Sequence, residues 1–236
     1  MKIKTLMLFA YDFPHKKTQD FIIRLLTEGY NIKYIVAAPW KALPIGPSSI
    51  RITPRQFGLI HPRLLCKRFK INYIVGAHNS RYTITYLKKN PVDLCIIAGA
   101  RIISEKTVEA TNNKILNVHP GLLPQVRGLD TLMWSINYNI PIGISAHLIG
   151  SKIDGGKLIY RKRLPLFKDD SILDISLRLL EMQQDILILA LKKLSTVDES
   201  RLLDMDTIKS KYNSKMPVLL EKKTLSKFKS WLKDLL

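Results

Sequence analysis

The amino-acid sequence predicts an α/β fold, in which a mainly parallel, Rossmann-like sheet is covered by helices on both faces. Short apolar runs alternate with segments of helical periodicity, and this β-α-β succession is typical of parallel sheets. A chain of 236 residues with 46% hydrophobic residues is long enough to bury a sizeable core. Polar residues follow several of the apolar runs, which is where such sheets bind ligands.

The amino-terminal elements can be placed from their apolar patterns. Residues 1–10 predict a first buried strand and not a signal peptide, because the run is short and Asp12 follows without a small-residue cleavage site. Residues 18–28 predict a helix with one apolar face, ended by Gly29. Residues 32–38 predict a second buried strand, and the proline-rich stretch 39–62 predicts a loop that contains His61.

The middle of the chain predicts four more strands. They are expected at residues 71–76, 94–98, 113–118 and 142–149, with a helix at 80–89 between the first two. His119-Pro120 ends the strand at 113–118, since proline lacks a ladder donor. We expect His15 and His61 to be solvated in their loops.

The carboxy-terminal part predicts a long helix at residues 171–194. Ser171 and Asp174 have the spacing of a capping box, with Asp in place of Glu. We therefore divide the chain into a catalytic domain, 1–195, and a basic tail, 196–236. The tail has enough apolar residues to dock on its own domain or on another subunit, so a homodimer is a working hypothesis.

The net charge of +19 is compatible with nucleic acid, an anionic membrane or a phosphorylated substrate as partner. Lysine and arginine are dispersed, and no nucleic-acid-binding motif is present, so we expect a solvated basic surface without specific nucleic-acid binding. Cys66 and Cys95 are the only cysteines, which excludes a disulfide framework and a four-cysteine metal site. We expect a cytoplasmic protein with no membrane span and no metal.

Three polar residues stand out at the ends of the later strands. Asn117 and His119 are two residues apart and so project from the same face of a strand. Asp154 lies in a turn with Gly155 and Gly156, after the strand that carries His147. Each residue taken alone is explained by strand capping. Together they provide a hydrogen-bond donor, a titratable base and a carboxylate, as needed for transfer at a carbonyl.

These residues resemble the motif of the formyltransferase family that uses 10-formyltetrahydrofolate. The matching blocks are Asn117 with His119, Leu122-Leu123-Pro124, Arg127-Gly128 and Asp154-Gly155-Gly156. The resemblance also includes 93–103 and extends from about residue 71 to 167. It implies that Asn117, His119 and Asp154 are catalytic. It also implies folate-binding residues, which are Gly99, Ala100, Arg101, Ile102, Ile103 and His147. As a strand residue, His147 is equally well explained by a hydrogen bond to a carbonyl group.

The resemblance narrows the acceptor amine without identifying it. The turn at 11–14 lacks the glycine- and serine-rich phosphate loop of the glycinamide ribonucleotide enzymes, and too few residues follow for the C-terminal barrel of methionyl-tRNA formyltransferases. A nucleotide-linked amino sugar, destined for a surface polysaccharide, is the favoured acceptor. Weaker candidates for its binding are His78, Asn79, Arg127 and Gly128, although the segment 78–80 is also explained as a helix cap. A glycinamide ribonucleotide or methionyl-tRNA enzyme, and a non-catalytic folate-binding relative, remain alternatives.

The resemblance also implies a separate role for each of the three catalytic residues. Asn117 is expected to donate its amide hydrogens to the oxyanion of a tetrahedral intermediate. His119 either shares that task when protonated or takes the amine proton when neutral, and the sequence leaves both open. Asp154 is expected to orient His119 and favour its charged form.

Overall fold

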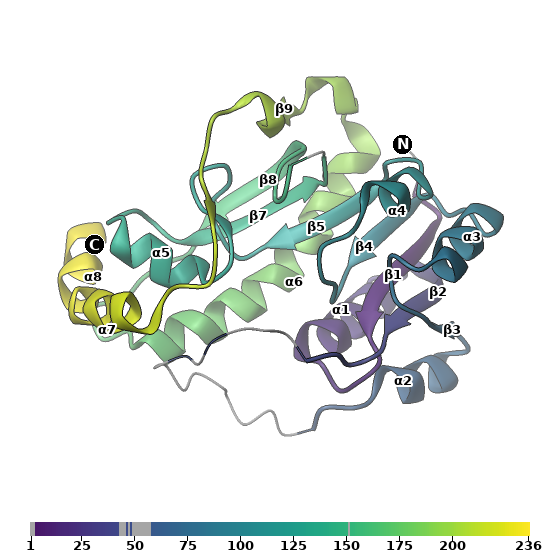
Figure 1. Ribbon diagram of the computed structural model, residues 1–236, viewed down its shortest axis with the longest axis horizontal. Helices are drawn as coiled ribbons and strands as arrows, with labels where there is room; N and C mark the ends of the chain where they lie inside the picture. The colour runs from purple at the N-terminus through teal and green to yellow at the C-terminus, as the bar shows by residue number, and fades with distance from the viewer. Residues whose placement is uncertain (1–2, 43–45, 47, 49–57, 151) are drawn as a thin grey trace. The chain divides into compact units, whose positions relative to one another are not determined.

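The computed structural model describes residues 3–42, 46, 48, 58–150 and 152–236 (Figure 1). The chain forms two compact units. The first consists of residues 1–42, 56–117 and 191–200, and the second of residues 43–55, 118–190 and 201–236. Most of the proline-rich stretch 39–62, for which the sequence predicts a loop, lies outside the described residues.

The first unit is built on a parallel sheet with the strand order β3-β2-β1-β4-β5. Its strands are β1 (Thr5–Tyr11), β2 (Asn31–Ala38), β3 (Asn72–Val75), β4 (Leu94–Ile97) and β5 (Ile115–His119). The central strand β1 pairs with β2 on one side and β4 on the other, and its residues 6–10 are completely buried. All five strands were predicted to within four residues at either end, because buried parallel strands are near-continuous apolar runs.

Among the described residues, four helices lie wholly within this unit: α1 (Lys16–Thr27), α2 (Pro62–Phe69), α3 (Arg81–Lys89) and α4 (Glu105–Glu109). Helix α1 buries Phe21, Ile22 and Leu25 on one face and is followed by Gly29, whose φ of 80° closes the helix. Helices α2 and α4 were not predicted. The first begins directly at the proline-rich stretch, and the second is only five residues long.

The second unit contains an antiparallel set of strands, β7 (Gly143–Leu148), β8 (Lys157–Arg163) and β9 (Leu203–Asp204). A separate two-stranded parallel ladder joins β6 (Arg127–Gly128) to β10 (Tyr212–Asn213). Its remaining elements are α5 (Thr131–Asn137), the 3₁₀ turn η2 (Met205–Thr207), α7 (Val218–Ser226) and α8 (Phe228–Leu235). Only β7 among these was predicted.

The long helix α6 (Ile172–Thr196) was predicted to within two residues of its ends. Its capping box is present: Ser171 N donates to Asp174 Oδ2 over 2.8 Å, and Asp174 N donates to Ser171 Oγ over 3.2 Å. The reciprocal bonds satisfy backbone donors that a helix start leaves open. The 3₁₀ turn η1 (Glu199–Arg201) follows.

The C-terminal tail docks on its own chain. Trp231 is 1% exposed and donates from Nε1 to Ile140 O over 2.9 Å, and Trp134 donates to Ser214 O over 2.9 Å. Met216 N donates to Asp130 Oδ2 over 2.8 Å. The tail therefore completes the second unit.

The predicted class, a mixed α/β fold with a mainly parallel sheet, is confirmed. None of the helices within the described part of the chain has the length and apolar character needed to cross a membrane.

Candidate active site

Strand β5 carries Asn117 and His119 at its carboxyl end, where Pro120 prevents further pairing. The imidazole of His119 is 5% exposed, and its Nε2 donates to Val126 O over 2.9 Å. Its Nδ1 lies 3.6 Å from Asp154 Oδ1. Both ring nitrogens thus face acceptor oxygens.

Gly121 allows this arrangement, although it was not predicted as a residue of the site. A Cβ atom at this position would lie 2.9 Å from His119 Nε2 and 2.9 Å from Val126 O. Ser145, completely buried on β7, fixes the same turn: its Oγ donates to Gly121 O over 2.7 Å and accepts from Leu123 N over 2.9 Å. The glycine that follows His119-Pro120 in the sequence could have indicated that the backbone lies close to the His119 ring here.

Asp154 is presented by a tight turn between β7 and β8, with a φ of 50°. Asp tolerates this left-handed conformation better than most residues. One carboxylate oxygen, Oδ2, accepts from Gly128 N over 2.8 Å, while Oδ1 faces His119. Gly128 has a φ of 94° and lies against the backbone of Asn213, so a side chain would not fit there. The predicted Arg127-Gly128 motif therefore positions Asp154.

His147 supports the same turn from strand β7. It is completely buried, and its Nδ1 donates to Gly155 O over 2.6 Å. Burial lowers the pKa of His147 to about 4, against the opposing effect of the Asp154 carboxylate; His119 and Arg127 lower it further. The contacts of His147 are therefore those of a neutral imidazole that anchors the backbone beside Asp154. Its predicted role toward folate stays a prediction.

Arg127 is 3% exposed and reaches into the tail. Its guanidinium Nη2 donates to Met205 O over 2.6 Å, and its backbone carbonyl accepts from Asn213 Nδ2 over 3.0 Å. Within the described residues its buried Nε has no hydrogen-bond partner. Arg127 thus lies beside the turn that presents Asp154, and its contact with the acceptor stays a prediction.

The predicted folate loop, residues 99–103, lies in the first unit after β4. Asn79 holds it from two sides: Nδ2 donates to Ile102 O over 2.9 Å, and Oδ1 accepts from Ser104 N over 2.8 Å. Arg101 Nη2 donates to Lys41 O over 2.7 Å, and Ile102 is 64% exposed. The loop thus combines an anchored backbone with an exposed apolar side chain, which suits a flat heterocyclic ring.

Gly99 has a packing role in this loop. A Cβ atom there would lie 2.9 Å from the ring of Tyr11 and 3.1 Å from the ring of His15. His15 accepts from Thr18 N and caps α1, and burial lowers its pKa to about 4. The expectation that His15 is solvated was therefore wrong, because the strand end and the helix start enclose its ring.

His78 and Asn79, predicted as weak acceptor-binding residues, have structural contacts in the first unit. His78 is 6% exposed, and its Nε2 lies 3.0 Å from Ala10 O and 3.2 Å from Val36 O. It thereby ties the ends of β1 and β2 together. The helix cap at this point is made by Ser80, whose Oγ accepts from Thr83 N over 3.2 Å.

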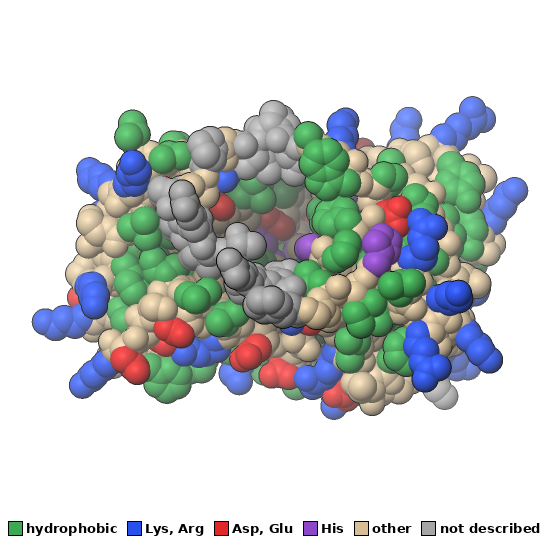
Figure 2. Space-filling view, turned by 90° about the horizontal axis from the view of Figure 1, so that it is seen from below, with side chains coloured by type: hydrophobic (Ala, Val, Ile, Leu, Met, Phe, Trp, Pro, Cys, Tyr) green, Lys and Arg blue, Asp and Glu red, His purple; other side chains and the backbone are tan. Residues whose placement is uncertain are grey.

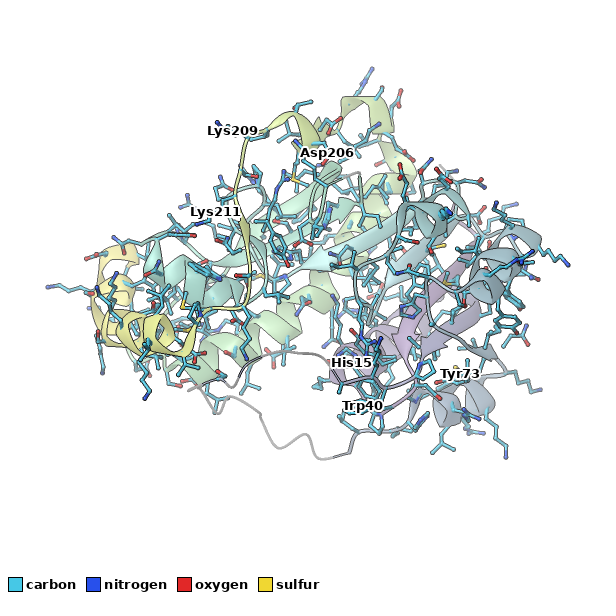
Figure 3. All side chains as sticks on the ribbon, viewed as in Figure 1. His15, Trp40, Tyr73, Asp206, Lys209 and Lys211 are labelled. Atoms are coloured by element: carbon cyan, nitrogen blue, oxygen red, sulfur yellow. The ribbon has the colours of Figure 1, made fainter. Side chains whose placement is uncertain are left out.

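An aromatic cluster follows β1 and was not predicted as a feature of the site. The rings of Tyr11 and Phe13 stack with centroids 4.9 Å apart and an interplanar angle of 9°. Trp40, just after β2, is 70% exposed. Asp12 accepts from Tyr73 Oη over 2.8 Å and faces Arg63 Nη2 at 3.3 Å. Figure 3 shows Trp40 and Tyr73 in this part of the first unit.

Basic side chains are scattered over the face seen in Figure 2, without a single concentrated patch. No group of three or more His, Cys, Asp or Glu side chains that could hold a metal ion occurs among the residues that the structure describes.

Part of the chain is similar to proteins of known function. Residues 75–191 match the family model described as formyl transferase. Phosphoribosylglycinamide formyltransferase of Haemophilus influenzae is 34% identical over 109 residues, which is 45% of this chain and 51% of the relative. Methionyl-tRNA formyltransferase of Caldicellulosiruptor saccharolyticus is 25% identical over 200 residues, which is 79% of this chain and 60% of the relative.

The chain thus spans between about half and three fifths of the length of these curated relatives. Among solved structures, a sugar N-formyltransferase from a Shewanella species superimposes with a TM-score of 0.61 at 18% identity, covering 95% of this chain and 87% of the other. That likeness supports the fold. The family model and these relatives show that residues 75–191, just under half of the chain, are similar to the formyl transferase family.

Proposed function

We propose that this protein is an N-formyltransferase that moves a formyl group from 10-formyltetrahydrofolate to a primary amine. The observation that carries the proposal is the contact between His119 and Asp154, with Asn117 two residues before His119 on the same strand. The curated relatives bear the names of formyltransferases, which supports the reaction class.

The reaction needs stabilisation of charge more than a strong nucleophile on the protein. The amine nitrogen forms a bond to the formyl carbon, and the carbonyl electron pair moves to oxygen as an oxyanion. The amine nitrogen then loses a proton, N10 of the folate gains one, and the bond from carbon to N10 breaks as the carbonyl forms again. Donors directed at the oxyanion therefore contribute most to the rate.

We assign each of the three candidate catalytic side chains one role in this reaction. Asn117 donates its amide hydrogens to the oxyanion. His119 acts in its protonated form and adds a positive charge, which agrees with the two acceptors that its nitrogens face. Asp154 holds the charged ring and takes the proton that leaves the amine. Its side chain is 15% exposed, which supports access from solvent.

Residues 99–103 are proposed to bind the pterin ring of the donor. The anchoring of their backbone by Asn79 and the exposure of Ile102 support this assignment. Gly99 and Arg101 shape the loop through packing and through the bond to Lys41 O. Ala100 and Ile103 complete the segment.

For the acceptor we propose an amino sugar linked to a nucleotide. The exposed indole of Trp40 and the stacked rings of Tyr11 and Phe13 offer flat faces to a nucleobase or sugar. Glycinamide ribonucleotide carries no nucleobase, so it has no aromatic ring that could stack on these side chains. Because the relatives are named as phosphoribosylglycinamide and methionyl-tRNA formyltransferases, glycinamide ribonucleotide and methionyl-tRNA are included among the amines to be tested.

The test is incubation of the purified protein with 10-formyltetrahydrofolate and a panel of amines, measuring release of tetrahydrofolate. The panel contains amino-sugar nucleotides, glycinamide ribonucleotide and methionyl-tRNA. We expect turnover with an amino-sugar nucleotide. Activity on glycinamide ribonucleotide or methionyl-tRNA alone would refute the proposed acceptor and leave the proposed reaction standing. If no amine of the panel receives a formyl group, the proposed reaction itself is contradicted.

A further inference from the structure

The C-terminal tail forms hydrogen bonds with the turn that presents Asp154. Both backbone groups of Gly156, which ends this turn, bond to the tail: its N–H donates to Asp206 Oδ1 over 2.9 Å, and its carbonyl accepts from Met205 N over 2.8 Å. Lys152, at the start of the turn, donates from Nζ to Asp206 O. Figure 3 marks Asp206 on this part of the tail.

His147 Nδ1 and Gly128 N also bond to this turn, at Gly155 O and Asp154 Oδ2, but neither bond involves the backbone of Gly156. Within it, Gly155 N donates to Lys152 O over 3.0 Å, and Asp154 and Gly156 both have positive φ values, of 50° and 80°. Gly156 is buried, so an unpaired N–H there would be costly. The carboxylate of Asp206 satisfies that N–H and so stabilises the conformation that directs Asp154 toward His119.

Asp206 is itself held firmly. Its backbone N–H donates to Asp204 Oδ1 over 2.9 Å, and β9 pairs with β8 through Asp204 opposite Lys157. Met205 is completely buried, and its carbonyl accepts from Arg127 Nη2. A carboxylate fixed in this way acts as a rigid support.

The tail is also anchored elsewhere, which separates the role of Asp206 from tail docking. Asn213 bonds to Arg127 O and accepts from Tyr138 Oη over 2.7 Å, and Trp231 is buried at the far end of the tail. Loss of the Asp206 carboxylate therefore leaves the tail docked and affects the turn.

We propose that Asp206 is a positioning residue for Asp154, so that the C-terminal tail contributes to the chemistry of the active site. The inference rests on the proposed function. An Asp206→Ala variant removes the acceptor for Gly156 N–H, whereas Asp206→Asn keeps an amide oxygen at the same place. Asp234→Ala is the matched control, because Asp234 is exposed on the same tail and contacts Asn139 Nδ2 at 3.3 Å.

The experiment measures kcat and KM for the amine with the full-length chain. We expect Asp206→Ala to lower kcat by about 10- to 100-fold with little change in KM, because a misplaced group costs rate and not ground-state binding. Asp206→Asn should restore most of kcat, and Asp234→Ala should match the wild type. The pH profile of kcat should change in Asp206→Ala alone, because the geometry of Asp154 and His119 is altered.

A wild-type kcat in Asp206→Ala overturns the proposal, and so does an Asp206→Asn variant that is as impaired as Asp206→Ala. A second readout does not need formyl transfer: NMR titration of the His119 ring and hydrogen exchange of the Gly156 amide. If the wild type transfers no formyl group, the proposed function fails, and this readout decides about Asp206. Faster exchange and an altered titration in Asp206→Ala support coupling to Asp154, and unchanged values contradict it.

Discussion

His119 lies between two oxygen acceptors: Val126 O at 2.9 Å from Nε2 and Asp154 Oδ1 at 3.6 Å from Nδ1. The first is a hydrogen bond that sets the orientation of the ring. The second is longer than a hydrogen bond and is an ion pair when the ring is protonated. This arrangement explains why the proposed mechanism gives His119 the role of a positively charged group and not of a base.

Asn117→Ala should lower kcat by roughly a hundredfold or more, because one lost oxyanion donor costs about 2.7–4 kcal/mol in comparable chemistry. KM for the amine should change little. Steady-state kinetics checks this, with Asn72→Ala as the control, since Asn72 is an exposed residue of β3. Near-wild-type kcat in the Asn117 variant would remove this residue from the mechanism.

Asp154→Asn should also lower kcat strongly, because the amide keeps the size of the side chain but loses the charge next to His119. An acceptor for Gly128 N–H is retained, so the turn should keep its shape. The exposed Asp169, changed to Asn, serves as the control. Equal activity of the two variants at all pH values would show that the carboxylate of Asp154 takes no part in catalysis.

Gly121→Ala should reduce both activity and stability. The added Cβ would meet His119 Nε2 and Val126 O, each at 2.9 Å, so the ring must move. Overpacking of this kind costs about 1–3 kcal/mol. Thermal unfolding and kinetics measure the two effects. Gly46→Ala is the control, since no atom of the described residues lies within 4 Å of a Cβ there; equal behaviour of the two variants would refute the steric account.

Stability should fall as the pH is lowered from 7 to 5. The pKa of His147 is depressed to about 4 by burial, whereas an unfolded histidine titrates near 6.5. The unfolded state then binds more protons, so this stabilisation is present above pH 6.5 and is lost as the pH falls toward 4. For His147 the loss between pH 7 and 5 is on the order of 2 kcal/mol.

Urea unfolding at several pH values measures this dependence. His147→Gln should show a smaller decline between pH 7 and 5 than the wild type, even if it is less stable at pH 7. His15, whose pKa is also lowered to about 4, contributes in the same direction and remains in both proteins. Identical declines would show that the His147 imidazole is not the source.

Local patterns in the sequence were sufficient for the strands and helices that have a clear period. Strands β1, β2, β4 and β7 are apolar runs, and α6 has both periodicity and a capping box. Strand β8 was missed because Arg161, Lys162 and Arg163 hide its apolar residues. The short β6, β9 and β10 exist only through pairing with distant partners, which no local pattern records.

In the candidate site, too, local motifs could be predicted from the sequence, whereas contacts between distant residues could not. His119 and Asp154, predicted from motif and resemblance, lie together in the structure. The residue that supports the turn of Asp154 comes from far along the chain, since Asp206 is 50 residues from Gly156. In the first unit, Asn79 holds the loop 99–103 from 23 residues before Ile102. Such contacts follow from tertiary packing, so the sequence alone named the candidate catalytic residues and missed most of the residues that hold them in place.

The most direct test of the central claim is transfer of the formyl group by the wild-type protein and by His119→Ala. Purified protein is incubated with 10-formyltetrahydrofolate and an amino-sugar nucleotide, and tetrahydrofolate and the formylated product are measured together. We predict equimolar products with the wild type and a loss of at least about a hundredfold with His119→Ala. Equal rates for the two proteins, or no product with any amine of the panel, would contradict the account.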